Sequence, residues 1–88
     1  LQVAPEEIEI LDGYVGRGYA LSRKEELDFI RDFARMEGLV LDPVYTGKCM
    51  YGFACEVDKG SFQKSGNVLF LHTGGLFGLF PVKEQFEL

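Results

Sequence analysis

The stretch Asp42-Pro43-Val44-Tyr45-Thr46-Gly47-Lys48 follows a short apolar run, residues 38–41, and His72-Thr73-Gly74-Gly75 follows a second one, residues 67–71. A continuous apolar run of this length is typical of a strand that is buried on both faces of a parallel sheet. In an open α/β sheet, ligands bind in the crevice outside the carboxyl ends of the strands. The sequence therefore predicts that both stretches lie beside a ligand-binding crevice.

Helical periodicity is present before the first apolar run and again between the two runs. Apolar side chains recur every three or four positions over residues 24–37 and again over residues 47–58. The Ser22 and Glu25 pair resembles a capping box at the start of the first helix, and Gly38 is suited to end it. Gly52 lies inside the second helix, where it costs about 1 kcal/mol relative to alanine.

Further strand and helix signals complete the expected order of elements. Residues 8–11 alternate loosely in polarity and end at Asp12-Gly13, a turn signal, which predicts another strand. A short helical turn is expected at residues 76–80. The predicted order is β-α-β-α-β, so the predicted fold class is α/β, a three-layer fragment with a parallel sheet and helices on its faces.

Composition excludes several classes of partner. The chain has 88 residues and a net charge of −5, which leaves no basic surface for nucleic acid. No apolar run approaches the roughly 20 residues that cross a bilayer. Cys49 and Cys55 have no metal-ligand spacing, which predicts no metal site, and free thiols fit a reducing, cytoplasmic location.

The chemistry-bearing residues gather at the predicted strand ends. Tyr45 and Thr46 follow the first run, and Thr73 follows the second. Because neighbouring strands lie about 4.8 Å apart, the two threonines are expected to face one small polar atom, such as a ring nitrogen. Gly74 has no Cβ and permits close approach of a ligand.

Two other motifs give weaker signals. The glycine-rich run at residues 13–18 has the order G-x-x-G-x-G, the reverse of the dinucleotide-binding fingerprint. His72 is the single histidine and stands near no nucleophile elbow, so a hydrolase triad is not supported.

From about Gly13 to Phe80 the chain resembles the D-cysteine desulfhydrase and 1-aminocyclopropane-1-carboxylate deaminase family, of the tryptophan-synthase-β-like group. The matching runs are residues 13–19, 34–38, 42–48 and 72–75. The resemblance implies a fold-type-II pyridoxal 5′-phosphate enzyme in which Tyr45 acts beside the substrate as an acid-base or anchoring group and Tyr19 helps to position the substrate. It also implies that the cofactor lysine and phosphate loop lie upstream, so that residues 1–88 are the C-terminal fragment of the cofactor-binding domain of a longer enzyme. The non-methionine start at Leu1 agrees with this interpretation.

The resemblance also bears on the reaction. Family members that open the cyclopropane ring carry Glu after the signature Tyr and Leu after the signature His, whereas this chain has Thr46 and Thr73. Neutral hydroxyls favour a protonated pyridine nitrogen much less than a carboxylate does. The threonines, which together with Gly74 form the expected cofactor-binding set, therefore favour β-elimination of D-cysteine over ring opening.

The sequence is also compatible with three other functions. Ring opening of 1-aminocyclopropane-1-carboxylate is the first, a non-catalytic α/β binding module is the second, and a structural fragment that packs an interface is the third. The expected partners are a small amino-acid substrate, the remainder of the same chain and a second copy of the complete protein in a homodimer. The fragment alone is expected to be inactive.

Overall fold

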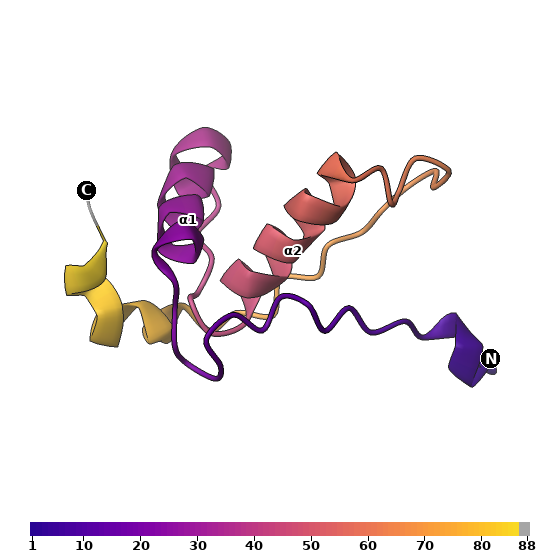
Figure 1. The fold of residues 1–88 in the computed structure, drawn as a ribbon, viewed down its shortest axis with the longest axis horizontal. Helices are drawn as coiled ribbons and strands as arrows, with labels where there is room; N and C mark the ends of the chain where they lie inside the picture. Colours follow the sequence, from indigo (N-terminus) through magenta and orange to yellow (C-terminus); the bar gives the residue numbers. More distant parts are fainter. Residues whose placement is uncertain (87–88) are drawn as a thin grey trace.

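The computed structural model describes residues 1–86, and this part of the chain is helical. Its elements are the 3₁₀ turn η1 (Pro5–Glu7), helix α1 (Lys24–Glu37), helix α2 (Thr46–Asp58) and the 3₁₀ segment η2 (Leu76–Gln85), as Figure 1 shows. Residues 1–86 form no β-strand. The predicted α/β fold with a parallel sheet is therefore wrong for this structure, whereas both predicted α-helices are confirmed.

Helix α1 has the predicted bounds but a different N-cap residue. Arg23, not Ser22, is the N-cap residue. Its backbone N–H donates to Glu26 Oε1 at 2.8 Å, so Glu26 takes the part that the sequence suggested for Glu25. At the other end Gly38 adopts a φ of +69° and donates its N–H to Ala34 O. The glycine ends the helix as predicted, because this backbone conformation strains residues that have a Cβ.

Helices α1 and α2 pack against each other around a small core. Ile30, Leu41 and Met50 are the buried hydrophobic residues of this core. Gly47 allows the close approach, since a Cβ at this position would lie 2.5 Å from Ile30 Cδ1. Partly buried hydrophobic side chains surround the core: Phe29, Phe33, Phe53, Phe70, Leu79 and Phe86.

The two apolar runs are extended but unpaired within residues 1–86. Leu41 is fully buried, yet Leu39 before it is 52 % exposed. In the second run Phe70 packs on the core, while Leu69 is 89 % exposed. The prediction of two strands buried on both faces is wrong, because a strand requires partners for its backbone and the apolar side chains alone do not supply them.

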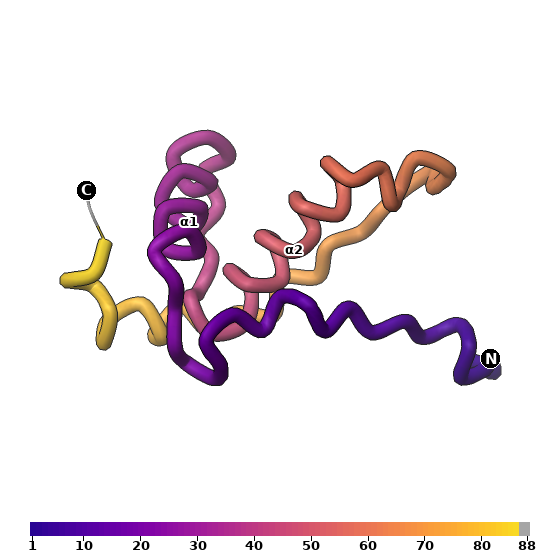
Figure 2. The backbone as a smooth tube through the Cα atoms, viewed as in Figure 1, coloured from indigo at the N-terminus to yellow at the C-terminus, as the bar shows by residue number. Residues whose placement is uncertain are grey.

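The N-terminal residues extend away from the helices as an arm. Residues 8–11, predicted as a strand, are irregular, and Ile10 is 82 % exposed. Figure 2 shows this arm leaving the body of the molecule. The segment η2 continues to Gln85, beyond the predicted turn at 76–80, and contains Pro81. Within residues 1–86, no helix has the length and apolar character needed to cross a bilayer.

Candidate functional site

Asp42 organises the start of α2. It is fully buried, and its Oδ1 accepts the backbone N–H groups of Val44 at 2.8 Å and Tyr45 at 2.7 Å. Its Oδ2 accepts the Thr46 N–H at 2.8 Å and the Thr46 hydroxyl at 2.6 Å. Four donors therefore saturate the lone pairs of this carboxylate. No role for Asp42 was predicted from the sequence, although an Asp before Pro and four residues before a Thr is a recognisable helix-start pattern.

The pKa of Asp42 reflects two opposing effects. Burial raises the pKa, while the hydrogen bonds from Thr46, Tyr45 and Val44 lower it. The net result is a pKa below the ordinary value, because hydrogen bonds to the charged form outweigh its desolvation. Asp42 is therefore an ionised carboxylate at neutral pH.

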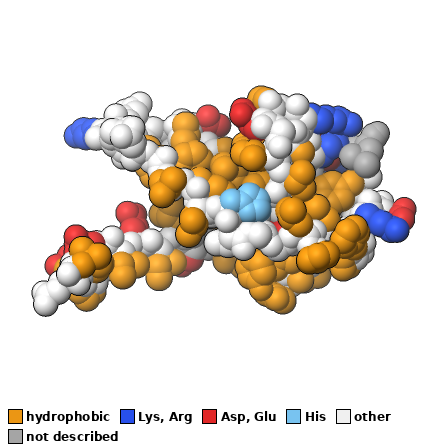
Figure 3. Space-filling view, turned by 180° about the vertical axis from the view of Figure 1, so that it is seen from behind, with side chains coloured by type: hydrophobic (Ala, Val, Ile, Leu, Met, Phe, Trp, Pro, Cys, Tyr) orange, Lys and Arg blue, Asp and Glu red, His pale blue; other side chains and the backbone are white. Residues whose placement is uncertain are grey.

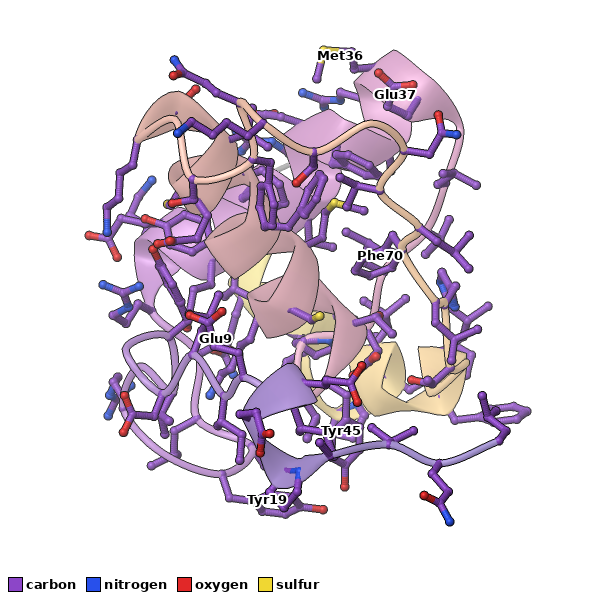
Figure 4. All side chains as sticks on the ribbon, turned by 90° about the vertical axis from the view of Figure 1, so that its right-hand side faces the viewer. Glu9, Tyr19, Met36, Glu37, Tyr45 and Phe70 are labelled. Carbon is purple, nitrogen blue, oxygen red and sulfur yellow. The ribbon has the colours of Figure 1, made fainter. Side chains whose placement is uncertain are left out.

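Tyr45 is the N-cap residue of α2 and meets Tyr19 at the surface. Their hydroxyl oxygens lie 2.9 Å apart, and their rings are edge-to-face with centroids 6.1 Å apart. Figure 4 shows both phenols together at one edge of the molecule. The hydrogen bond with Tyr19 is the main cause that raises the pKa of Tyr45, so its phenol stays protonated at neutral pH. A protonated phenol can donate a hydrogen bond or a proton to a bound molecule.

The stretch at residues 72–75 lies against the stretch at residues 42–48. His72 Nδ1 accepts the Gly74 N–H at 3.1 Å, so the proton belongs on Nε2, which lies 2.8 Å from Val40 O. Next to it, a Cβ on Gly75 would lie 3.0 Å from the Asp42 carboxyl carbon. The two sequence stretches are therefore neighbours in space. Figure 3 shows the single histidine exposed among hydrophobic side chains.

The three predicted cofactor-binding residues have different environments. Thr46 is 2 % exposed, and its hydroxyl is engaged with Asp42. Thr73 is exposed at the surface. Gly74 has a φ of +93°, with open space where a Cβ would lie. Thr73 and Gly74 can therefore meet a ligand directly, while Thr46 lies behind the surface.

An open depression adjoins the tyrosine pair and has a volume of about 460 Å³. Its lining residues are Leu11, Tyr14, Val15, Gly18, Tyr19, Val44, Tyr45, Lys48 and Cys49. A second, more apolar cavity of about 320 Å³ lies between α1 and η2. That cavity contains none of the predicted site residues. The depression beside Tyr19 and Tyr45 is the candidate substrate region because it contains both predicted catalytic residues, although Thr46, Thr73 and Gly74 do not line it.

The sequence is similar to parts of known proteins. Over 80 residues the chain is 44 % identical to a Thermotoga maritima protein described as "Putative 1-aminocyclopropane-1-carboxylate deaminase". The chain is homologous to the 1-aminocyclopropane-1-carboxylate deaminase and D-cysteine desulfhydrase family. A member from Arabidopsis thaliana, the "Bifunctional D-cysteine desulfhydrase/1-aminocyclopropane-1-carboxylate deaminase, mitochondrial", is 45 % identical over 71 residues.

The match covers most of this chain but only a small part of each relative. The match takes in 91 % of this chain but 24 % of the Thermotoga protein, and 80 % of this chain but 18 % of the Arabidopsis protein. The chain thus spans about a quarter of the length of the Thermotoga protein and less than a fifth of the length of the Arabidopsis protein. No family model matches it.

Proposed function

We propose that the complete protein containing this chain is a pyridoxal 5′-phosphate enzyme that converts D-cysteine and water into pyruvate, hydrogen sulfide and ammonia. The proposal rests on the homology together with one observation at the site. The carboxylate beside Thr46, Asp42, already accepts four hydrogen bonds. It has no lone pair left for a ring nitrogen, and it engages the Thr46 hydroxyl, so the group that remains for such a nitrogen is the neutral hydroxyl of Thr73.

The residues present fit a heteroaromatic ring with an unprotonated nitrogen. Thr73 carries a hydroxyl at the surface, and Gly74 beside it leaves space that a Cβ would fill. A hydroxyl that donates a hydrogen bond favours the unprotonated nitrogen. The Thr46 hydroxyl donates its proton to Asp42 and is therefore not a donor to the ring nitrogen in this structure. When bound, pyridoxal 5′-phosphate supplies the electron sink for bond breaking at the substrate Cα and Cβ.

Tyr45 and Tyr19 carry the proton chemistry in this proposal. Their hydroxyls are 2.9 Å apart, so a proton given up by Tyr45 can be replaced from Tyr19. The raised pKa keeps Tyr45 protonated, which suits a group that donates a hydrogen bond or a proton to the substrate. A thiolate leaves readily, so its departure requires only a weak electron sink.

Ring opening of 1-aminocyclopropane-1-carboxylate to 2-oxobutanoate and ammonia is the second candidate. It is favoured by the names of both relatives, one described as a deaminase and one as bifunctional. A third candidate is a non-catalytic binding module. Absorbance separates it from both enzymes, because a complete protein with bound pyridoxal 5′-phosphate has a chromophore near the visible region.

The test measures sulfide and α-keto acid formation by the complete protein with each substrate. We expect pyruvate and sulfide from D-cysteine. The double variant Thr46→Glu with Thr73→Leu places a carboxylate near the ring nitrogen and removes a hydroxyl, so sulfide release should fall and ring opening should appear or increase. The matched control, Thr46→Ser with Thr73→Ser, keeps both hydroxyls and should keep the D-cysteine preference. An unmodified protein that opens the ring and ignores D-cysteine would overturn the proposal.

A further inference from the structure

Lys48 is a buried cation without a carboxylate partner in residues 1–86. The residue is 8 % exposed. Its Nζ donates to Val15 O at 2.8 Å and to Gly18 O at 2.7 Å, and these two carbonyl groups are its hydrogen-bond partners in this part of the chain. Withdrawing an ammonium group from water is unfavourable unless it is hydrogen-bonded. These bonds therefore connect α2 to the glycine-rich loop, residues 13–18, across 30 or more positions of sequence.

The loop that Lys48 contacts is fixed at its start by Tyr14, whose hydroxyl donates to Glu56, and near its end by the Leu21 N–H, which donates to Gly18 O at 3.2 Å. Within it, the Gly18 N–H to Val15 O distance is 3.4 Å, longer than an ordinary hydrogen bond. Tyr19 follows directly and stands between two residues of positive φ, Gly18 at +119° and Ala20 at +58°. A backbone of this kind persists only where its surroundings hold it. The two Lys48 bonds supply such a restraint immediately before Tyr19.

The start of α2 carries both the tyrosine that meets Tyr19 and the lysine that contacts the loop. Tyr45 is the N-cap residue of α2, and Lys48 lies in its first turn three positions later. Tyr45 presents its phenol at the surface, and Lys48 reaches the loop that carries Tyr19. All three residues line the same depression.

We propose that Lys48 is a positioning residue, whose ammonium group holds the glycine-rich loop so that the Tyr19 phenol reaches the Tyr45 phenol. The inference deepens the proposed function, on which it rests for the importance of the tyrosine pair. The contacts of Lys48 with the loop, and of the loop with the tyrosine pair, are all made within this chain. Lys48 acts through Val15 and Gly18 and does not itself take part in the chemistry.

The experiment follows ionisation of Tyr45 in the complete protein, by NMR of ¹³Cζ-labelled tyrosine with Tyr45→Phe to assign the signal. In the unmodified protein, the hydrogen bond with Tyr19 raises the Tyr45 pKa. The variant Lys48→Met releases the loop, so the hydrogen bond from Tyr19 should be lost and the Tyr45 pKa should shift down toward its ordinary value, as it should in Tyr19→Phe. Loss of the positive charge by itself would shift that pKa upward, so the two effects differ in sign. Lys48→Arg keeps donors and should retain part of the upward shift. Lys64→Met, at an exposed lysine, should leave the titration unchanged.

The double variant Lys48→Met with Tyr19→Phe separates positioning from general stabilisation. If Lys48 acts through Tyr19, the double variant should titrate like Tyr19→Phe alone. An unchanged Tyr45 titration in Lys48→Met, or a further shift in the double variant, would overturn the inference. Lys48→Gln, which keeps one donor, serves in its place if Lys48→Met does not fold. The titration needs no substrate, so a protein inactive toward D-cysteine would refute the proposed function and leave this result standing.

Discussion

Asp42 and Thr46 bond to each other in both directions. The Thr46 hydroxyl donates to Asp42 Oδ2 at 2.6 Å, and the Asp42 backbone N–H donates to Thr46 Oγ1 at 2.8 Å. Both residues are buried, so neither group has water as an alternative partner. This closed pair fixes the start of α2 and with it the position of Tyr45. Its energetic importance can be tested directly.

The variant Asp42→Asn should destabilise the protein by about 1–3 kcal/mol, because the new amide NH₂ cannot accept two of the present donors. Urea denaturation gives the free energy of unfolding. Asp58→Asn at the exposed end of α2 is the matched control. It should change stability little or raise it slightly, since a negative charge at a helix C-terminus is unfavourable. An equal effect of the two substitutions would contradict the role assigned to the Asp42 and Thr46 pair.

The same carboxylate should contribute to acid sensitivity. The folded-state pKa of Asp42 lies below its ordinary value of 3.8, so the folded state stabilises the ionised form. Its contribution is present above that ordinary value and is lost as pH falls through the folded-state pKa. Stability measured from about pH 5 to about pH 2 should therefore fall less steeply in Asp42→Asn than in the unmodified protein. Parallel curves would show that Asp42 does not carry the effect.

Gly52 should respond to alanine in a way that depends on Tyr14. Alanine is ordinarily better than glycine inside a helix by about 1 kcal/mol. Here a Cβ would lie 2.9 Å from the Tyr14 ring, which Glu56 holds in place by a hydrogen bond. Gly52→Ala should therefore destabilise the protein, whereas in a Tyr14→Ala background the same change should stabilise it. Thermal unfolding of the four proteins measures this reversal of sign, and its absence would show that Tyr14 does not restrict Gly52.

Gly74 and Gly75 should differ in their tolerance of alanine. Both have positive φ, +93° and +85°, so either substitution should cost roughly 1–2 kcal/mol through backbone strain. At Gly75 the new Cβ would in addition press on the Asp42 carboxyl group, at 3.0 Å, whereas at Gly74 it would enter open space. Gly75→Ala should thus show the larger loss of unfolding free energy in urea. A larger loss at Gly74 would contradict the contact between the two sequence stretches.

Local sequence patterns predicted the helices well. The three- and four-residue spacing of apolar residues gave α1 and α2 almost to the residue, and Gly38 ended α1 as expected. These features depend on neighbours within one or two turns, and the sequence displays them directly. The sequence also singled out the residues of the tyrosine pair and the two stretches that meet at Asp42 and Gly75.

Only the tertiary structure decided what lies opposite each of these residues. Apolar residues 39–41 and 68–71 indicated buried strands, but no ladder forms within residues 1–86, since pairing depends on backbone that lies far away in sequence. Tertiary structure also brings Tyr19 to Tyr45 and Lys48 to the glycine-rich loop, because these residues are far apart in sequence. The four donors on Asp42 depend on the turn that the backbone makes after it. A sequence specifies the chemistry of each side chain and the period of each helix, while partners across a fold are set by packing in three dimensions.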